Sequence, residues 1–122
     1  MSYRLKKLNS QIKKEITKII QEEIDDPRVE MVSITRVVTR ADLKEAHIYF
    51  SVLKEEEAKD VSKILNRMRG YLRRILGRKM RIKILPSLRF FPDDSIRYSV
   101  EIYRKIEEIM HGEENNSVDK RE

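Results

Sequence analysis

The sequence predicts an α+β fold in which helices cover one face of a three-stranded sheet. Three observations lead to this prediction. Apolar residues recur with helical spacing in three segments, strand-like segments lie between them, and 122 residues suffice for one core of moderate size. The expected order is helix, strand, strand, long helix, strand, helix. Because three strands cannot bury both faces in water, the helices should cover one of them.

The first helix is expected over residues 5–24, where the apolar residues form a single helical stripe. They are Leu5, Leu8, Ile12, Ile16, Ile19, Ile20 and Ile24. Asp26-Pro27 should end this helix, because the residue before a proline is pushed out of the helical region. We therefore expect the sheet to begin immediately after this proline.

Two strands should follow as an antiparallel hairpin. Residues 29–39 are rich in β-branched side chains, and residues 45–53 alternate regularly. In the second strand Ala46, Ile48, Phe50 and Val52 share one face, while His47, Tyr49 and Ser51 share the other. The first set should face the core.

The long helix is expected after the acidic run Glu55-Glu56-Glu57, which complements a helix N-terminus. Its apolar stripe continues to Leu76. Met80, Ile82 and Ile84 then alternate with basic residues, which predicts a third strand from residue 80. Pro86 should interrupt this strand, and Leu88 and Phe90 should resume its buried side.

The last helix is expected after the turn Pro92-Asp93-Asp94-Ser95, whose side chains can cap it. Its apolar positions are Ile96, Val100, Tyr103, Ile106 and Met110, flanked by Ile102 and Ile109. Gly112 should end it. We therefore expect one domain over residues 1–111 and a disordered polar tail over residues 112–122.

Positive charge is concentrated between Val61 and Pro92. This stretch holds ten Lys or Arg residues and no Asp or Glu, although the whole chain carries only +6. Localised positive charge indicates a polyanionic partner, and seven of the ten are arginines, which bind phosphate bidentately. The predicted RNA-binding residues are Lys63, Arg67, Arg69, Gly70, Arg73, Arg74, Gly77, Arg78, Lys79, Arg81 and Lys83.

Two glycines occupy the polar side of the long helix. With Val61 at zero on a helical wheel, Gly70 and Gly77 fall at about 180° and 160°, opposite the apolar stripe. One explanation is structural, with a kink at Gly70 and a C-cap at Gly77. The other is functional, because a missing side chain lets a phosphate approach between flanking arginines. The sequence leaves both explanations open, and Tyr71 at the edge of this side could stack on a base.

Composition excludes several classes of function. The chain has no cysteine, no apolar run long enough to cross a membrane and no secretory signal, so we expect a cytoplasmic protein. His47 and His111 have no partner at metal-ligand spacing, and no nucleophile, base and orienting group recur together. We expect no enzymatic activity, metal, cofactor or small-molecule substrate, and a monomer in solution.

Several short motifs together resemble the ribosome-binding factor A family. They are Asp26-Pro27-Arg28, Asp42-Leu43 with Ala46, Gly70-Tyr71-Leu72-Arg73, Pro86-Ser87-Leu88-Arg89-Phe90, and Asp93-Asp94-Ser95-Ile96. Their order and spacing extend from residue 4 to about residue 106. Members of this family kink the central helix at an Ala-x-Gly step, which aligns here with Met68-Arg69-Gly70, so Met68 replaces the small residue.

The resemblance implies a KH-like fold of type II, with the order α-β-β-α(kinked)-β-α. It also implies a non-enzymatic assembly factor that binds 16S rRNA on the immature 30S subunit. Assistance with late maturation, processing of the rRNA 5′ end and a role in cold adaptation follow from the same resemblance. Two alternatives remain, a basic DNA-binding regulator whose helix enters a major groove and a module that binds an acidic protein.

Overall fold

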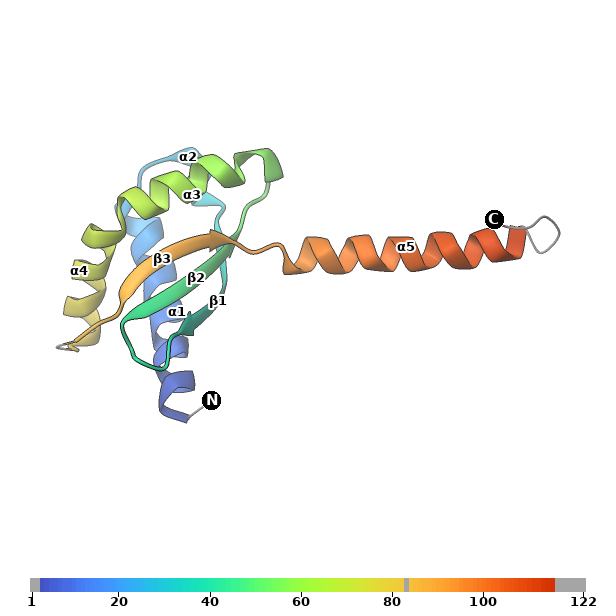
Figure 1. The fold of residues 1–122 in the computed structure, drawn as a ribbon. Helices are drawn as coiled ribbons and strands as arrows, with labels where there is room; N and C mark the ends of the chain where they lie inside the picture. Colours follow the sequence, from blue (N-terminus) through green and yellow to red (C-terminus); the bar gives the residue numbers. More distant parts are fainter. Residues whose placement is uncertain (1–2, 83, 116–122) are drawn as a thin grey trace.

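The computed structural model describes residues 3–82 and 84–115, and it has the predicted α+β architecture (Figure 1). Its elements are α1 (Tyr3–Glu23), α2 (Pro27–Glu30), β1 (Ser33–Thr39), β2 (Glu45–Ser51), the 3₁₀ turn η1 (Glu55–Glu57), α3 (Ala58–Arg67), α4 (Arg69–Met80), β3 (Ser87–Pro92) and α5 (Ser95–Asn115). The sheet order is β1-β2-β3, with β1 antiparallel and β3 parallel to β2. Helix α1 packs on β1 and α4, whereas α3 and α4 pack on β3.

The core lies between the helices and one face of the sheet. From β2 it receives Ala46, Ile48 and Phe50, none of which is accessible to solvent. The predicted stripe of α1 supplies Ile12, Ile16, Ile19 and Ile20. The alternation of β2 and the helical spacing of α1 therefore identified the buried faces correctly.

A short helix, α2, occupies the place where the sequence predicted the first strand to begin. Asp26 caps it, because its carboxylate accepts a hydrogen bond of 2.9 Å from the Arg28 backbone N–H, and Pro27 occupies the first turn. An acidic N-cap followed by proline is a helix-start signal, and it outweighs the strand preference of Val29. The predicted strand start at Val29 is thus wrong, and β1 begins at Ser33.

The long helix is divided at Met68. This residue has φ −94° and ψ 4°, and its N–H is shared between the carbonyls of Ile64 and Leu65, each 3.2 Å away. The Leu72 N–H then bonds to the Met68 carbonyl at 2.9 Å and restarts the ladder in α4. A break is therefore present within the Met68-Arg69-Gly70 step, and it is centred on Met68 rather than on Gly70.

The end of α4 also differs from the prediction. The helix continues through Gly77 to Met80, and Arg81 ends it in the left-handed conformation, with φ 56°. The Arg81 N–H bonds to the Gly77 carbonyl at 2.9 Å. Both the C-cap at Gly77 and the strand from Met80 are therefore wrong, because Arg, Lys and Met are good helix formers and three alternating residues are a weak strand signal.

Strand β3 is held to α3 by the side chain of Asn66. Its amide donates to the Phe90 carbonyl at 2.9 Å and accepts from the Phe90 N–H at 2.9 Å. Because β3 is at the edge of the sheet, these backbone groups have no neighbouring strand on that side. The Asn66 amide therefore takes the place of a fourth strand at one residue.

Replacing Asn66 by Ala should lower the free energy of unfolding by about 2 kcal/mol, because two part-buried backbone groups lose their partner. Urea unfolding followed by circular dichroism measures this. Ser62→Ala is the matched control, since it removes only a 3.3 Å contact to the same amide and should change stability by less than about 0.5 kcal/mol. Equal stability of the two variants would contradict the role of Asn66.

Helix α5 extends away from the rest of the molecule (Figure 1). The sequence predicted its existence, but its described apolar side chains do not enter the core. Ile102, Tyr103, Ile106, Ile109 and Met110 are 40–65% exposed, while the side chains of Ile96 and Val100 lie outside the described part. Gly112 does not end the helix, which runs to Asn115, and residues 116–122 of the predicted tail lie outside the described residues.

Candidate nucleic-acid interface

Helices α3 and α4 separate apolar and basic side chains onto two sides. The buried side consists of Val61, Leu65, Leu72, Ile75 and Leu76. The opposite side is exposed and carries most of the predicted RNA-binding residues that belong to these two helices. The assignment of sides from the helical wheel is confirmed for both helices, although the break at Met68 lies between them.

A row of positions follows the exposed side from one helix to the other. It consists of Lys63, Arg67, Gly70, Arg74 and Arg78, and we call it the basic row. Lys63 and Arg67 are four residues apart in α3, and Gly70, Arg74 and Arg78 are four apart in α4, so each set lies on one side of its own helix. Among the described residues, no acidic side chain lies within ion-pair distance of the four basic members. Their charges are thus available to an external anion.

Two of the predicted residues are engaged within the protein. The Arg73 guanidinium donates through Nε to the carbonyls of Leu85 and Pro86, each at 3.1 Å, and through Nη2 to the Leu85 carbonyl. It thereby fixes the buried segment that leads into β3. Lys79 forms a 3.6 Å ion pair with Glu22 of α1. Arg73 and Lys79 therefore connect α4 to other parts of the fold, although both residues are exposed.

The other predicted residues lie outside the basic row. Arg69 and Arg81 are exposed, at the start of α4 and at its C-cap, and neither has an ion-pair partner among the described residues. Gly77 is half-buried near Leu85. Lys83 falls outside the described residues.

Tyr71 connects the start of α4 to the end of α1. Its hydroxyl donates to the Glu23 carboxylate at 2.7 Å. This hydrogen bond to Glu23 raises the pKa of Tyr71 above its usual value, with a smaller opposing effect from nearby arginines. The Arg74 guanidinium carbon lies 5.8 Å from the centre of the Tyr71 ring, within cation–π range. Tyr71 therefore orients Arg74 of the basic row, and its own hydroxyl is committed to α1.

Gly70 lies in the middle of the basic row with open space around it. A Cβ atom built on Gly70 would have no neighbour within 4 Å, and its φ is not positive. Neither a positive φ nor the packing therefore requires glycine at this position in the first turn of α4. The break at Met68 lies within the Met68-Arg69-Gly70 step where the family resemblance places the kink, and the missing side chain at Gly70 also leaves the helix backbone open at this position.

A hollow of about 380 Å³ lies beside the break, between the end of α1, α2 and α3. Its wall includes the acidic residues Glu23, Asp25 and Asp26 and the basic residues Arg28 and Arg67. Hydrogen bonds from Arg28 lower the pKa of Asp26 below its usual value, which keeps that carboxylate ionised. The hollow therefore carries charges of both signs and borders the basic row at Arg67.

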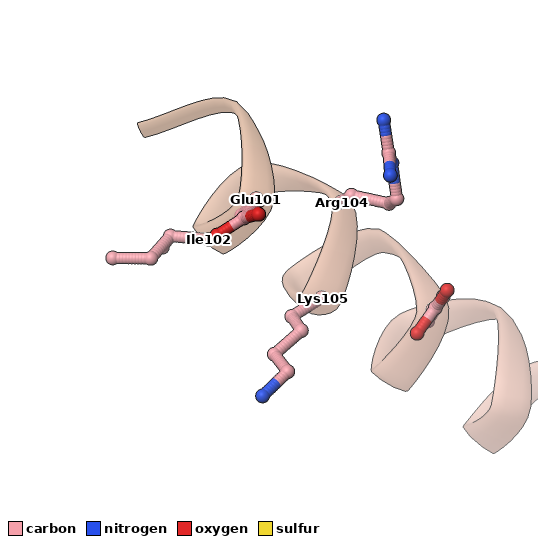
Figure 2. A pocket seen from close by; sticks show the side chains of 5 residues that line it. Glu101, Ile102, Arg104 and Lys105 are labelled. Carbon is pink, nitrogen blue, oxygen red and sulfur yellow. The ribbon is translucent and has the colours of Figure 1, made fainter. Parts of the chain in front are cut away.

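The hollow shown in Figure 2 lies along α5 alone. It measures about 540 Å³, but all of its lining residues, among them Glu101, Arg104 and Lys105, belong to that one helix. Because no second element closes it, it does not enclose a ligand.

Among residues 3–82 and 84–115, no three His, Cys, Asp or Glu side chains gather as a metal site would require. No helix in that part is long and apolar enough to cross a membrane.

Sequence reasoning missed two residues that shape the site. Asn66 lies inside the basic stretch but binds β3, and Asp93 was assigned to a turn although only 4% of its side chain is exposed. The Asp93 carboxylate accepts a hydrogen bond from the Thr35 hydroxyl and lies 3.6 Å from Arg36 Nε. Their partners are 24 or more residues away in sequence, so no local pattern could reveal these contacts.

Comparisons with known proteins agree with this architecture. The family model described as ribosome-binding factor A matches residues 4–110. The ribosome-binding factor A of Clostridium botulinum (strain Eklund 17B / Type B) is 40% identical over 111 residues, which cover 88% of this chain and 96% of that protein. The corresponding protein of Pseudomonas paraeruginosa is 35% identical and covers 92% of this chain and 94% of its own length.

Solved structures give the same result. The crystal structure of ribosome-binding factor A from Thermus thermophilus matches with a TM-score of 0.66 at 28% identity, covering 74% of this chain and 97% of that one. A homology model of the Thermus thermophilus factor, fitted into a cryo-electron-microscopy map of a 30S complex, matches with a TM-score of 0.63 at 28% identity, covering 72% of this chain and 93% of that one. The α+β, KH-like fold predicted from the sequence is thereby confirmed. The chain belongs to the ribosome-binding factor A family.

Proposed function

We propose that this protein binds the immature 30S subunit through 16S rRNA, with the basic row facing the RNA backbone. It assists late maturation of the subunit, including processing of the rRNA 5′ end, by binding rather than by catalysis. The Thermus thermophilus relative has been fitted into a map of its complex with the 30S subunit, which supports the choice of partner.

The observation that carries this proposal is the environment of Gly70. It is an exposed glycine that the fold does not need, and it lies between Arg67 and Arg74, whose charges have no ion-pair partner in the described structure. A phosphate can approach the helix backbone only where no side chain projects, and arginines on both sides can then bind it bidentately. Glycine at position 70 lowers the stability of the fold relative to alanine, and it leaves the helix backbone open to a phosphate of the RNA.

Gly70→Ala should therefore separate stability from binding. The added methyl group meets no atom, so the free energy of unfolding of the variant should be about 0.5–1 kcal/mol higher than that of the unmodified protein. Its affinity for small-subunit RNA should fall several-fold, and that of Gly70→Leu should fall further. Thermal unfolding and filter binding to the RNA measure the two effects.

Gln21→Ala serves as the control for Gly70→Ala, because it is an exposed change on α1 outside the basic row. It should leave RNA affinity unchanged. If Gly70→Ala and Gly70→Leu also bind RNA normally, close approach at Gly70 is refuted.

Co-sedimentation tests the proposed partner. The protein should migrate with immature small subunits at low salt and dissociate as salt rises. Four phosphate contacts by the basic row predict a fall of about three in log affinity per tenfold rise in salt. Recovery only in ribosome-free fractions at low salt would contradict the proposal. Displacement by duplex DNA rather than by ribosomal RNA would instead favour a DNA-binding regulator.

A further inference from the structure

The face of the sheet opposite the core carries a second cluster of aromatic and basic side chains. Helices α1, α3 and α4 pack on the other face, and α5 extends away from the sheet (Figure 1). The strand register places Arg36, Tyr49 and Phe91 side by side in one row, and Val38, His47 and Arg89 in the next. Successive rows in a sheet are about 7 Å apart. We call these six residues the outer-face cluster.

The Phe91 ring contacts both of the other rings of the cluster. The ring centres of Tyr49 and Phe91 are 5.7 Å apart with their planes tilted by 32°, and those of His47 and Phe91 are 5.0 Å apart edge to face. All three side chains are half-buried. Because each ring is supported by its neighbour, together they form a fixed surface rather than separate mobile side chains.

Arg36 extends this surface with a planar cation. Its guanidinium carbon lies 3.9 Å from the centre of the Tyr49 ring, and its Nε lies 3.6 Å from the buried Asp93 carboxylate. The Arg36 side chain is nevertheless 53% exposed. One plane of the guanidinium is therefore covered by Tyr49 and its edge is fixed by Asp93, while the other plane remains open for stacking.

The opposite edge of the cluster is also basic. The Arg89 side chain is 52% exposed, and its guanidinium lies 3.8 Å from the Glu45 carboxylate, which also contacts His47 Nε2 at 2.7 Å. Glu45 thus orients both side chains and neutralises part of this edge. The two arginines stand on either side of the rings, where they can contact the phosphates of a strand that crosses the sheet.

We propose that the outer-face cluster is a second nucleic-acid contact, which binds unpaired bases of single-stranded RNA by stacking. Rings and guanidinium planes are the groups on which proteins stack splayed-out bases, and flanking arginines complement the phosphates. A docked protein helix would need mainly aliphatic neighbours, and Val38 is the only aliphatic member of the cluster. This site is distinct from the basic row and extends the proposed function from backbone binding to base contact.

Nuclear magnetic resonance with the unmodified protein tests this assignment. A ten-nucleotide single-stranded RNA of mixed sequence is added, and the ring resonances of His47, Tyr49 and Phe91 are followed. Stacking should shift them upfield, with the shift saturating as RNA is added. Shifts confined to α3 and α4 would overturn the proposal, as would ring shifts that depend on protein concentration alone, which would indicate that a second copy covers this face.

Variants make the test quantitative. Tyr49→Leu combined with Phe91→Leu keeps apolar side chains but removes the rings, and it should weaken binding of the same RNA at least about tenfold. Ser33→Ala, on the exposed surface of β1 beyond the cluster, is the control and should bind normally. A folded double variant with unchanged affinity would refute stacking.

Failure of this inference is distinguishable from failure of the proposed function. The double variant should still sediment with small subunits, because its basic row is intact. Replacing the arginines of the basic row should instead release the protein from subunits while the ring shifts with single-stranded RNA persist. Loss of both activities in either variant would contradict two separate sites.

Discussion

Replacing Arg67, Arg74 and Arg78 together by Glu should lower affinity for the small ribosomal subunit about a thousandfold. Each of the three lost charge-assisted hydrogen bonds contributes about 1.5 kcal/mol, and each 1.4 kcal/mol is a factor of ten in affinity. The fold should survive, because the three side chains are exposed and have no ion-pair partner in the described structure. Co-sedimentation and circular dichroism measure the two outcomes.

The matched control reverses three exposed lysines on α1, namely Lys13, Lys14 and Lys18. Both triple variants change the net charge by the same amount, so long-range attraction to RNA falls equally in each. If the two variants lose the same affinity, only total charge matters and the basic row has no special role.

Replacing Arg73 by Ala should have its largest effect on stability, not on binding. Its guanidinium donates hydrogen bonds to the carbonyls of Leu85 and Pro86, and both of these residues are buried. Leaving these acceptors without a donor should lower the free energy of unfolding by about 2–3 kcal/mol. Arg73→Lys should restore only part of this, because one ammonium group cannot reproduce the planar fork of arginine. Urea unfolding compares the variants.

Arg74→Ala is the natural comparison for Arg73→Ala. Arg74 is adjacent in sequence, exposed, and hydrogen-bonded to no other described residue. Its replacement should change stability by less than about 0.5 kcal/mol while weakening RNA binding. The reverse pattern, with a stable Arg73→Ala variant that no longer binds RNA, would place Arg73 among the phosphate ligands.

Hydrophobic periodicity correctly predicted the helices and strands that bury one side in the core. The stripe of α1 and the alternation of β2 each continue for several repeats, so both were assigned correctly. Short patterns failed. Met80, Ile82 and Ile84 form an alternation of only three apolar residues. In the structure Met80 is the last residue of α4, and Ile84 is 80% exposed.

The orientation of an element depends on contacts that periodicity does not encode. The stripe of α5 is as regular as that of α1, yet Tyr103 and Ile109 are more than 60% exposed. The core face of the sheet is covered by α1, α3 and α4, whereas α5 extends away from it. Amphipathic spacing therefore predicted the helix but not its position.

The candidate site was predicted in outline and refined by the structure. Charge density and helical spacing placed the basic side chains on one side of the long helix. They could not distinguish the role of Arg74 from that of Arg73. Arg74 makes no hydrogen bond to another described residue, whereas Arg73 donates to carbonyls twelve and thirteen residues further along the chain. They also left open whether Gly70 serves a kink or the approach of a ligand, and the structure places a break at Met68, in the same Met68-Arg69-Gly70 step.

The central claim is that the basic row lies against small-subunit RNA, and tethered hydroxyl-radical cleavage tests it most directly. The natural chain has no cysteine, so Arg69→Cys next to Gly70 and Lys14→Cys on α1 each give one attachment point for an iron chelate. Bound to small subunits, the Arg69→Cys protein should cleave 16S rRNA strongly at a few sites, and the Lys14→Cys protein should cleave it weakly. Strong cleavage from position 14 with none from position 69 would contradict the account.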